Sequence, residues 1–183
     1  MQSKTEITTS FQTKWAEVES LIAGMADDKF VAKPDPEVWS IAEEFDHVVK
    51  SAAAVSSAMK VSPFILKWKF GKPNRDIRNY DECFNRYHEK LASVRGKAVA
   101  PSPFISEEGK SFNKDSMLNH WGMTGNKLEK HIRKWSDNNL DKVLIPHPLL
   151  GKMMVREILF FTHFHTEHHL KSLKKKANQQ PLQ

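Results

Sequence analysis

The chain has 183 residues, enough for one domain with a hydrophobic core, and its single cysteine, Cys83, excludes an intramolecular disulfide and fits a reducing compartment. The amino-terminal residues are polar and no run approaches the roughly 18 apolar residues of a membrane span, so we expect a cytoplasmic protein with no membrane partner. The net charge of +6 comes from scattered basic residues with one dense run at 171–176, which argues against nucleic-acid binding.

The first predicted helix covers residues 11–25. Its apolar residues recur every three or four positions, which is the period of a helix face turned toward a core. Residues 1–10 are predicted to be a polar lead-in, and Gly24 lies in a plausible C-cap region. The apolar stripe consists of Phe11, Trp15, Val18, Ile22 and Met25.

The second predicted helix runs from Ser40 to Lys60. Ser40 and Glu43 have the capping-box spacing, in which a hydroxyl and a carboxylate satisfy each other's free backbone N–H groups. His47 lies at the margin of the apolar stripe, among small side chains that leave room beside its imidazole. Glu43 or Glu44 could serve as a supporting acceptor, or both could simply face solvent. Taken alone, however, His47 is better interpreted as a histidine on a helix surface.

The middle of the chain is predicted to be a long connection. Residues 61–78 contain two prolines and a glycine as turn signals, so we expect an irregular crossing segment. A supplementary helix follows, capped by Asn79 and ended by Gly96, and Cys83 on this helix is interpreted as structural. Residues 97–111 are predicted to be a loop.

A third long helix is predicted from Asn113 to Asp137. Gly122 and Gly125 each cost about 1 kcal/mol in a helix interior, so they either permit close helix packing or open space near a pocket. The residues after this helix form a turn-rich connection with room for one short extended piece. Helix faces suggest three pocket-lining residues beyond the histidines, namely Trp39, Glu43 and Trp121.

The last predicted helix, residues 153–176, carries four histidines within seven residues. His165 and His169 are four apart and therefore stack on one face, within the apolar stripe. His163 points to the far side, and His168 lies on the flank. Two imidazoles at this spacing form half of a metal site, although a hydrogen-bonded or partly exposed pair fits the spacing as well.

These elements predict an all-α fold. Four long helices form a bundle, and the long connection with its supplementary helix lies between the second and third of them. No strand pattern and no internal repeat is visible. We expect a single domain over residues 1–183, with its core at about 11–174.

Three motifs in this order resemble the DinB/YfiT-like superfamily of metal-binding four-helix proteins. The first motif is Trp39-Ser40-Ile41 followed by Glu43 and by Asp46-His47. The second, residues 147–151, reads His-Pro-Leu-Leu-Gly. The third begins at Thr162 and includes the histidine pair. Each motif is short, but their order and spacing make the joint match specific.

The resemblance implies a DinB-like bundle with a divalent metal held by His47, His165 and His169. Zinc or nickel suits three neutral imidazoles and keeps open positions for water or a ligand. Such an ion lowers the pKa of a bound water or thiol. A site made from His163 and Glu167 is the alternative, which we reject because that pair faces away from the stripe.

Two functions follow from the resemblance. The first is a metal-dependent enzyme, either an S-transferase that joins a low-molecular-weight thiol to a small electrophile or a related hydrolase. The alternative is a non-catalytic, stress-associated bundle in which the metal is structural or absent. Family members are frequently dimers, and the chain is rich in aromatic residues, so we also expect a homodimer.

Overall fold

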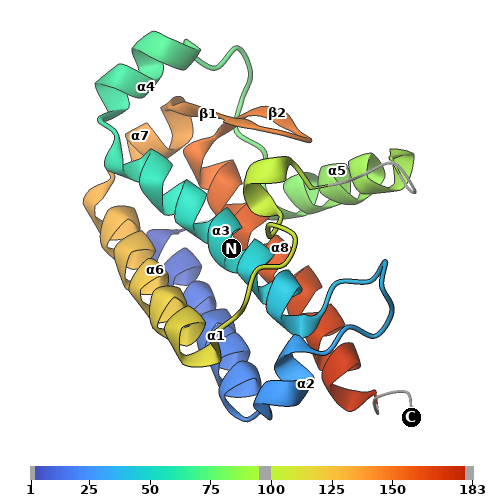
Figure 1. Cartoon of the computed structure of the whole chain (residues 1–183). Helices are drawn as coiled ribbons and strands as arrows, with labels where there is room; N and C mark the ends of the chain where they lie inside the picture. The colour runs from blue at the N-terminus through green and yellow to red at the C-terminus, as the bar shows by residue number, and fades with distance from the viewer. Residues whose placement is uncertain (1–2, 95–99, 180–183) are drawn as a thin grey trace.

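The computed structural model describes residues 3–94 and 100–179, which form a helical bundle with one small β-hairpin (Figure 1). The elements, in chain order, are α1 (Lys4–Ala23), α2 (Asp27–Val31), α3 (Ile41–Lys60), α4 (Pro63–Phe70), α5 (Tyr80–Ser93), the 3₁₀ helix η1 (Ser102–Phe104), α6 (Lys114–Lys134), α7 (Asp137–Lys142), β1 (Leu144–His147), β2 (Gly151–Met154) and α8 (Val155–Asn178). Among the helices of these residues, none is both long and apolar enough to cross a bilayer.

The four long helices are α1, α3, α6 and α8. Helices α1 and α3 each pack against both α6 and α8, so the order around the bundle is α1, α6, α3, α8. The long connection between α3 and α6 carries α5 back across the outer side of α8 (Figure 1). This confirms the predicted all-α bundle with a supplementary helix between the second and third long helices.

Helix α1 begins earlier than predicted. The Ser3 hydroxyl accepts a hydrogen bond from the Glu6 backbone N–H, and the Glu6 carboxylate accepts one from the Ser3 N–H. This capping box starts the helix at Lys4, and Ile7 in its second turn is fully buried. The expected polar lead-in is therefore wrong from Ser3 onward, whereas the expected C-cap at Gly24 is confirmed.

Helix α4 occupies eight residues of the predicted irregular segment. Ser62 caps it by accepting a hydrogen bond from the Phe64 backbone N–H. The first helical residue is Pro63, which has no backbone N–H, and this is tolerated because an N–H at that position has no partner within the helix. Gly71 ends the helix with a φ of 83°, a backbone conformation that favours glycine. The prediction failed because turn signals at both ends of a short helix resemble those of an irregular chain.

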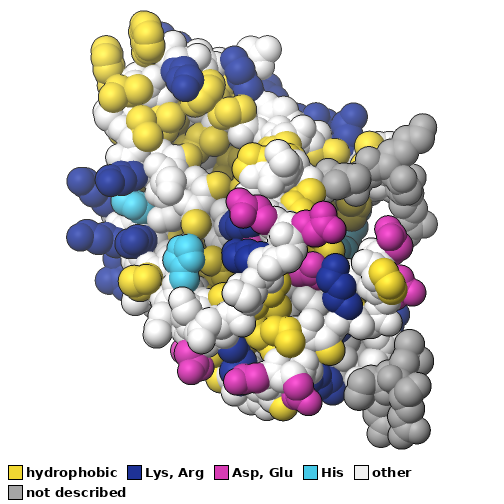
Figure 2. Space-filling model, in the orientation of Figure 1, with side chains coloured by type: hydrophobic (Ala, Val, Ile, Leu, Met, Phe, Trp, Pro, Cys, Tyr) yellow, Lys and Arg dark blue, Asp and Glu magenta, His cyan; other side chains and the backbone are white. Residues whose placement is uncertain are grey.

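The outer face of α4 is apolar. The side chains of Phe64 and Trp68 are 78% and 82% exposed, and only Leu66 on this helix is buried. Figure 2 shows hydrophobic side chains gathered over α4 at the upper left, with lysine and arginine side chains beside them. This apolar face packs against nothing within the described chain.

A buried carboxylate fixes the segment between α4 and α5. Glu157, in the first turn of α8, is fully buried and accepts two hydrogen bonds from the Arg75 guanidinium, at 2.5 and 2.6 Å. It also accepts backbone hydrogen bonds from Arg78 at 2.9 Å and from Met154 at 3.1 Å. The supplementary helix α5 then starts at its predicted cap, Asn79, while the predicted end at Gly96 lies outside the described residues.

The predicted extended piece before the last helix is one arm of a hairpin. Strands β1 and β2 are antiparallel, and His147 pairs with Gly151 at the turn. The turn is closed by the His147 side chain, whose Nδ1 accepts hydrogen bonds from the backbone N–H groups of Leu149 and Leu150, each at 3.1 Å. Helix α8 follows immediately, so the hairpin sets where its first turn lies.

Candidate metal centre

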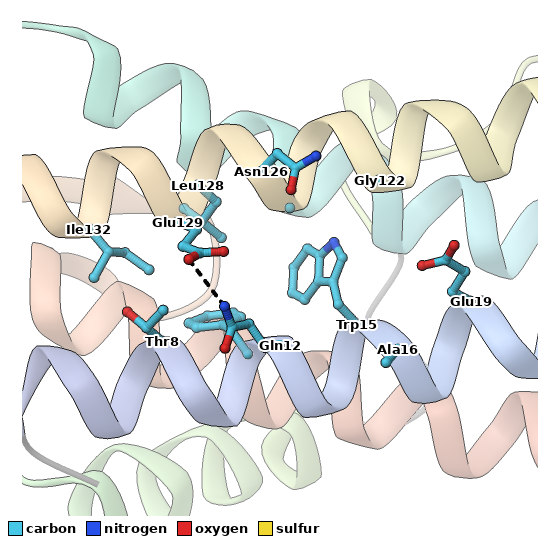
Figure 3. Close-up of a pocket in the computed structure, with 12 residues that line it drawn as sticks. Thr8, Gln12, Trp15, Ala16, Glu19, Gly122, Asn126, Leu128, Glu129 and Ile132 are labelled. Carbon is cyan, nitrogen blue, oxygen red and sulfur yellow. Dashed lines mark hydrogen bonds between the residues drawn. The ribbon is translucent and has the colours of Figure 1, made fainter.

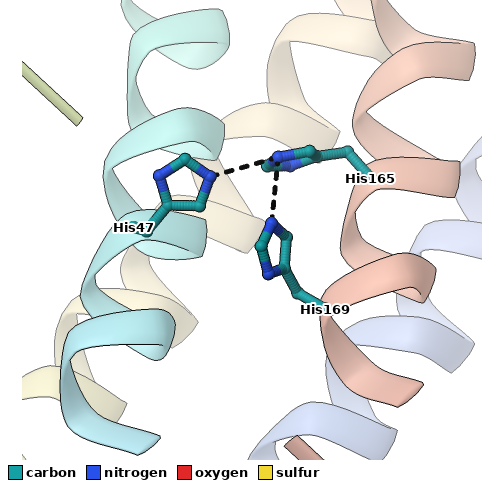
Figure 4. A group of neighbouring side chains, drawn as sticks. All are labelled: His47, His165 and His169. Carbon is teal, nitrogen blue, oxygen red and sulfur yellow. Dashed lines mark hydrogen bonds between the residues drawn. The ribbon is translucent and has the colours of Figure 1, made fainter. Parts of the chain in front are cut away.

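Three imidazoles meet where α3 faces α8. His47 comes from α3, and His165 and His169 come from successive turns of α8 (Figure 4). The His165 Nε2 atom lies 3.2 Å from the Nε2 atoms of both His47 and His169. One nitrogen from each ring therefore points to a common centre, and these nitrogens lie within 4.8 Å of one another. The structure brings together all three histidines that were predicted as metal ligands.

The outward nitrogens of two rings are held by acceptors. The Nδ1 atom of His47 lies 3.1 Å from the Phe104 carbonyl oxygen, and the Nδ1 atom of His169 lies 2.7 Å from the Glu44 carboxylate. Since a carbonyl and a carboxylate only accept hydrogen bonds, each Nδ1 carries the proton. With the proton on Nδ1, the inward Nε2 of a neutral imidazole has a free lone pair, and converging lone pairs are the donor set that a divalent cation requires.

Glu44 is a charged acceptor although its side chain is buried. Burial by itself raises the pKa of this carboxyl, but hydrogen bonds from His169 and Lys176 outweigh burial and lower the pKa to about 2. Ser172 also donates to it at 3.0 Å. The predicted choice between Glu43 and Glu44 is thus resolved: Glu44 supports the histidines, while the Glu43 carboxylate caps α3 and pairs with Lys33.

Two of the three rings, those of His47 and His165, are neutral near pH 7. Burial, together with the proximity of His169, lowers the pKa of His47 to about 4. Burial also lowers the pKa of His165 well below its ordinary value, and the neighbouring histidines add to this effect. Metal ligation needs an unprotonated imidazole nitrogen, so the burial that disfavours the imidazolium keeps these side chains ready to bind.

The other histidines of α8 have different surroundings. His163 faces away from the three-histidine cluster, as predicted, but α1 and α5 cover that side and bury it. Its Nε2 lies 2.6 Å from the Ser10 hydroxyl and its Nδ1 lies 2.9 Å from the Tyr80 hydroxyl. Glu167 forms an ion pair with Lys171. Each member of the rejected pair therefore has other partners, and His163 and Glu167 form no hydrogen bond or ion pair with each other among the described residues.

Comparison with known proteins identifies the family. The sequence profile of the DinB superfamily matches residues 10–173. The chain belongs to the DinB superfamily. It is 26% identical over 158 residues to YuaE, an uncharacterized protein of Bacillus subtilis (strain 168), with 84% of this chain and 86% of YuaE covered.

A solved structure shares the fold of this DinB-superfamily protein. YfiT from Bacillus subtilis, described as a probable metal-dependent hydrolase with an unusual four-helix bundle topology, superposes with a TM-score of 0.63. The match covers 96% of this chain and 86% of YfiT at 14% sequence identity, so it establishes the shared fold. The resemblance predicted from the three sequence motifs is confirmed.

A cavity of about 660 Å³ opens beside the three histidines of this DinB-superfamily chain. Trp39 lines the cavity as predicted, with its ring centroid 5.2 Å from that of His47, and His168 also lines it. The prediction for Trp121 is wrong. This side chain is fully buried and stacks on Trp15 at 4.0 Å between ring centroids, in the core between α1 and α6.

A second cavity of about 390 Å³ lies between α1 and α6, away from the histidines (Figure 3). Both suggested roles of the α6 glycines are observed here. A Cβ atom at Gly125 would lie 2.5 Å from the Trp15 indole, so glycine permits this close packing, whereas the space beside Gly122 is open. Gln12 donates a hydrogen bond to Glu129 across the cavity. Nothing in its lining resembles the three-histidine arrangement.

Proposed function

We propose that this DinB-superfamily protein is a divalent-metal-dependent hydrolase whose metal ligands are His47, His165 and His169. The observation that carries the proposal is the convergence of three Nε2 atoms, two of which belong to rings whose Nδ1 proton is held by an acceptor. Zinc or nickel suits such a set of nitrogen ligands. The description of YfiT as a probable metal-dependent hydrolase supports the same reading.

A bound ion would supply a Lewis acid and lower the pKa of a water molecule. The chain's own groups orient the ligands. The Phe104 carbonyl and the Glu44 carboxylate hold the His47 and His169 rings, and Lys176 and Ser172 hold Glu44 in turn. The burial of these groups limits the reorganisation needed when substrate enters the cavity.

An S-transferase that activates a low-molecular-weight thiol is the second candidate function. The size of the cavity favours it, because about 660 Å³ accommodates a thiol and a small electrophile together. The same three histidines would serve both reactions, since a bound ion lowers the pKa of a thiol as it does that of water. The two candidates differ only in the nucleophile.

The deciding experiment begins with elemental analysis of protein purified without a histidine tag. We expect about one zinc or nickel per chain, lost in His165→Ala and retained in His163→Ala, which truncates the same residue type two positions away. Equal metal content in all three proteins would remove the proposed site. Metal-loaded protein is then assayed with neutral esters and, separately, with a thiol plus an electrophile.

The assay separates the candidate functions. Ester hydrolysis without a thiol supports the hydrolase, and thiol consumption that depends on the electrophile supports the transferase. Bound metal with neither reaction, across substrates of both classes, would favour the alternative of a non-catalytic, stress-associated bundle with a structural metal.

We also propose a homodimer and a cytoplasmic location. The exposed apolar face of α4, with Phe64 and Trp68, supports pairing, because apolar side chains of this size are seldom left in water. The buried thiol of Cys83 fits a reducing compartment. Small-angle scattering should give a mass of two chains, reduced to one chain in Trp68→Glu. A monomer mass for the unmodified protein contradicts the dimer.

A further inference from the structure

We infer that the cavity beside the three histidines binds an uncharged, largely apolar molecule with a carbonyl group, and that the His147 Nε2–H donates the hydrogen bond that positions this carbonyl. The inference deepens the proposed function: its consequence for catalysis rests on that function, whereas the binding itself does not. His147 is a positioning residue, separate from the three predicted ligands.

The hairpin turn fixes which nitrogen of His147 carries the proton. Its Nδ1 accepts two backbone hydrogen bonds, from Leu149 and Leu150, each at 3.1 Å. A nitrogen that accepts N–H groups has no proton of its own, so the neutral ring is protonated at Nε2. The backbone of the turn thus makes the rest of the ring a hydrogen-bond donor with a fixed orientation.

The position of His147 leaves that donor available to a ligand. His147 lines the cavity, and no acceptor for its Nε2–H is found within residues 3–94 and 100–179. The Phe161 ring contacts both His147 and His165. Its centroid lies 4.2 Å from the centroid of the His147 ring and 4.9 Å from that of the His165 ring. The His147 Nε2–H donor is therefore separated from His165, a predicted metal ligand, by one aromatic ring. It would contact a part of the bound molecule remote from the reacting atoms.

The remaining wall selects the chemical class of the ligand. Its described side chains are predominantly apolar, including Val55, Ile145, Leu149 and Ile158. Its polar side-chain groups other than the imidazoles are the Trp39 indole N–H and hydroxyls, such as that of Tyr87, whose pKa is raised by burial so that it keeps its proton. An apolar wall with neutral donors favours a ligand with an apolar body and a neutral acceptor, because a charged group would lose its hydration on entry.

A pair of probes with nearly the same shape tests the inference. Acetophenone and ethylbenzene differ in having a carbonyl or a methylene beside the ring, and neither can be hydrolysed. Binding is followed by NMR titration of chelator-treated protein, so the result depends on neither activity nor metal. We expect acetophenone to bind roughly 3- to 10-fold more tightly than ethylbenzene, as one neutral hydrogen bond would give.

The variant His147→Asn removes the N–H donor at the Nε2 position while keeping the turn, because the asparagine amide ends one bond short of that position. An asparagine carbonyl can accept the backbone N–H two residues on, as in an Asx turn, so the hairpin retains an acceptor. We expect the variant to lose the preference for acetophenone and to bind ethylbenzene as before. His168→Asn, which replaces another histidine of the same cavity lining, should keep the preference and serves as the matched control.

Three outcomes would overturn the inference. They are failure of both probes to bind the unmodified protein, equal affinity for the two, and an acetophenone preference that survives in His147→Asn with an unchanged melting temperature. Acetophenone selectivity without any ester hydrolysis by metal-loaded protein would instead overturn the proposed hydrolase and leave the binding inference standing.

Discussion

His163 and His165 lie two residues apart on α8, yet their surroundings differ completely. Both side chains are 7% exposed. Both nitrogens of His163 have hydroxyl partners, on Ser10 and Tyr80, so the ring is fully satisfied by the protein. The Nε2 of His165 instead faces the Nε2 atoms of His47 and His169, whose protons are held on their other nitrogens.

The comparison shows that burial alone does not distinguish a structural histidine from a ligand. What distinguishes them is whether each nitrogen is already paired with a complementary group. The same holds for the two buried carboxylates: Glu157 joins backbone and arginine groups, whereas Glu44 supports a ring that points to the common centre. The predictions below perturb these two kinds of environment in turn.

The largest expected effect is on stability, from Glu157→Gln. Arg75 would lose its ion partner, and we expect a loss of about 3 kcal/mol at pH 7, at the lower end for breaking a buried pair because Arg75 is partly exposed. Urea unfolding monitored by circular dichroism measures it. A loss below about 1 kcal/mol would contradict the anchoring role of Glu157.

The same variant should change the pH dependence of stability. Burial raises the pKa of Glu157, but hydrogen bonds from Arg75 and from the backbone of Arg78 and Met154 outweigh it, so the net pKa lies below the ordinary 4.5. The ionised carboxylate therefore stabilises the fold above about pH 4.5. We expect the stability difference between the two proteins to shrink progressively as the pH falls below that value.

An intermediate effect is expected from Glu44→Gln, which weakens the support of the three-histidine cluster. Metal affinity should fall about 10- to 100-fold, because the amide holds His169 Nδ1–H less strongly than a carboxylate does. A competition titration with a chromophoric chelator measures the change. Glu43→Gln is the control, since Glu43 caps α3 without reaching the cluster, and equal affinities in the two variants would count against the role of Glu44.

The smallest effect is expected from Tyr80→Phe, which removes one hydroxyl partner of His163. We expect a loss of about 1 kcal/mol in unfolding free energy, the usual value for one buried hydrogen bond, with no change in metal content. Thermal unfolding and elemental analysis test both parts. Loss of metal in this variant would show that the two environments on α8 are coupled.

Much of the site could be predicted from the sequence, for identifiable reasons. The spacing of His165 and His169 places both rings on one helix face whatever surrounds the helix. His47 was indistinguishable from a surface histidine until the resemblance to a family added the missing long-range information. The capping box at Ser40 and the cap at Asn79 were equally local, and the box of Ser3 and Glu6 has the same short spacing although no helix start was predicted there.

The supporting contacts were not predictable in the same way. The partner of His47 is the backbone carbonyl of Phe104. Because every residue has a backbone carbonyl, the sequence does not indicate which one accepts this hydrogen bond. Glu43 and Glu44 are adjacent, so a small rotation of α3 decides which of them faces α8. Helix α4 turns aromatic side chains outward, against the usual pattern, and its exposed face could not be anticipated from periodicity.

The separation of the three histidines along the chain bears on how the protein is made. His47 and His165 are 118 residues apart, and Lys176, which holds Glu44, is 132 residues from it. A chain emerging from the ribosome thus presents His47 long before its partners are synthesised. At the proposed metal site the three ligands come together only after α8 has docked, so binding of a metal there would follow folding.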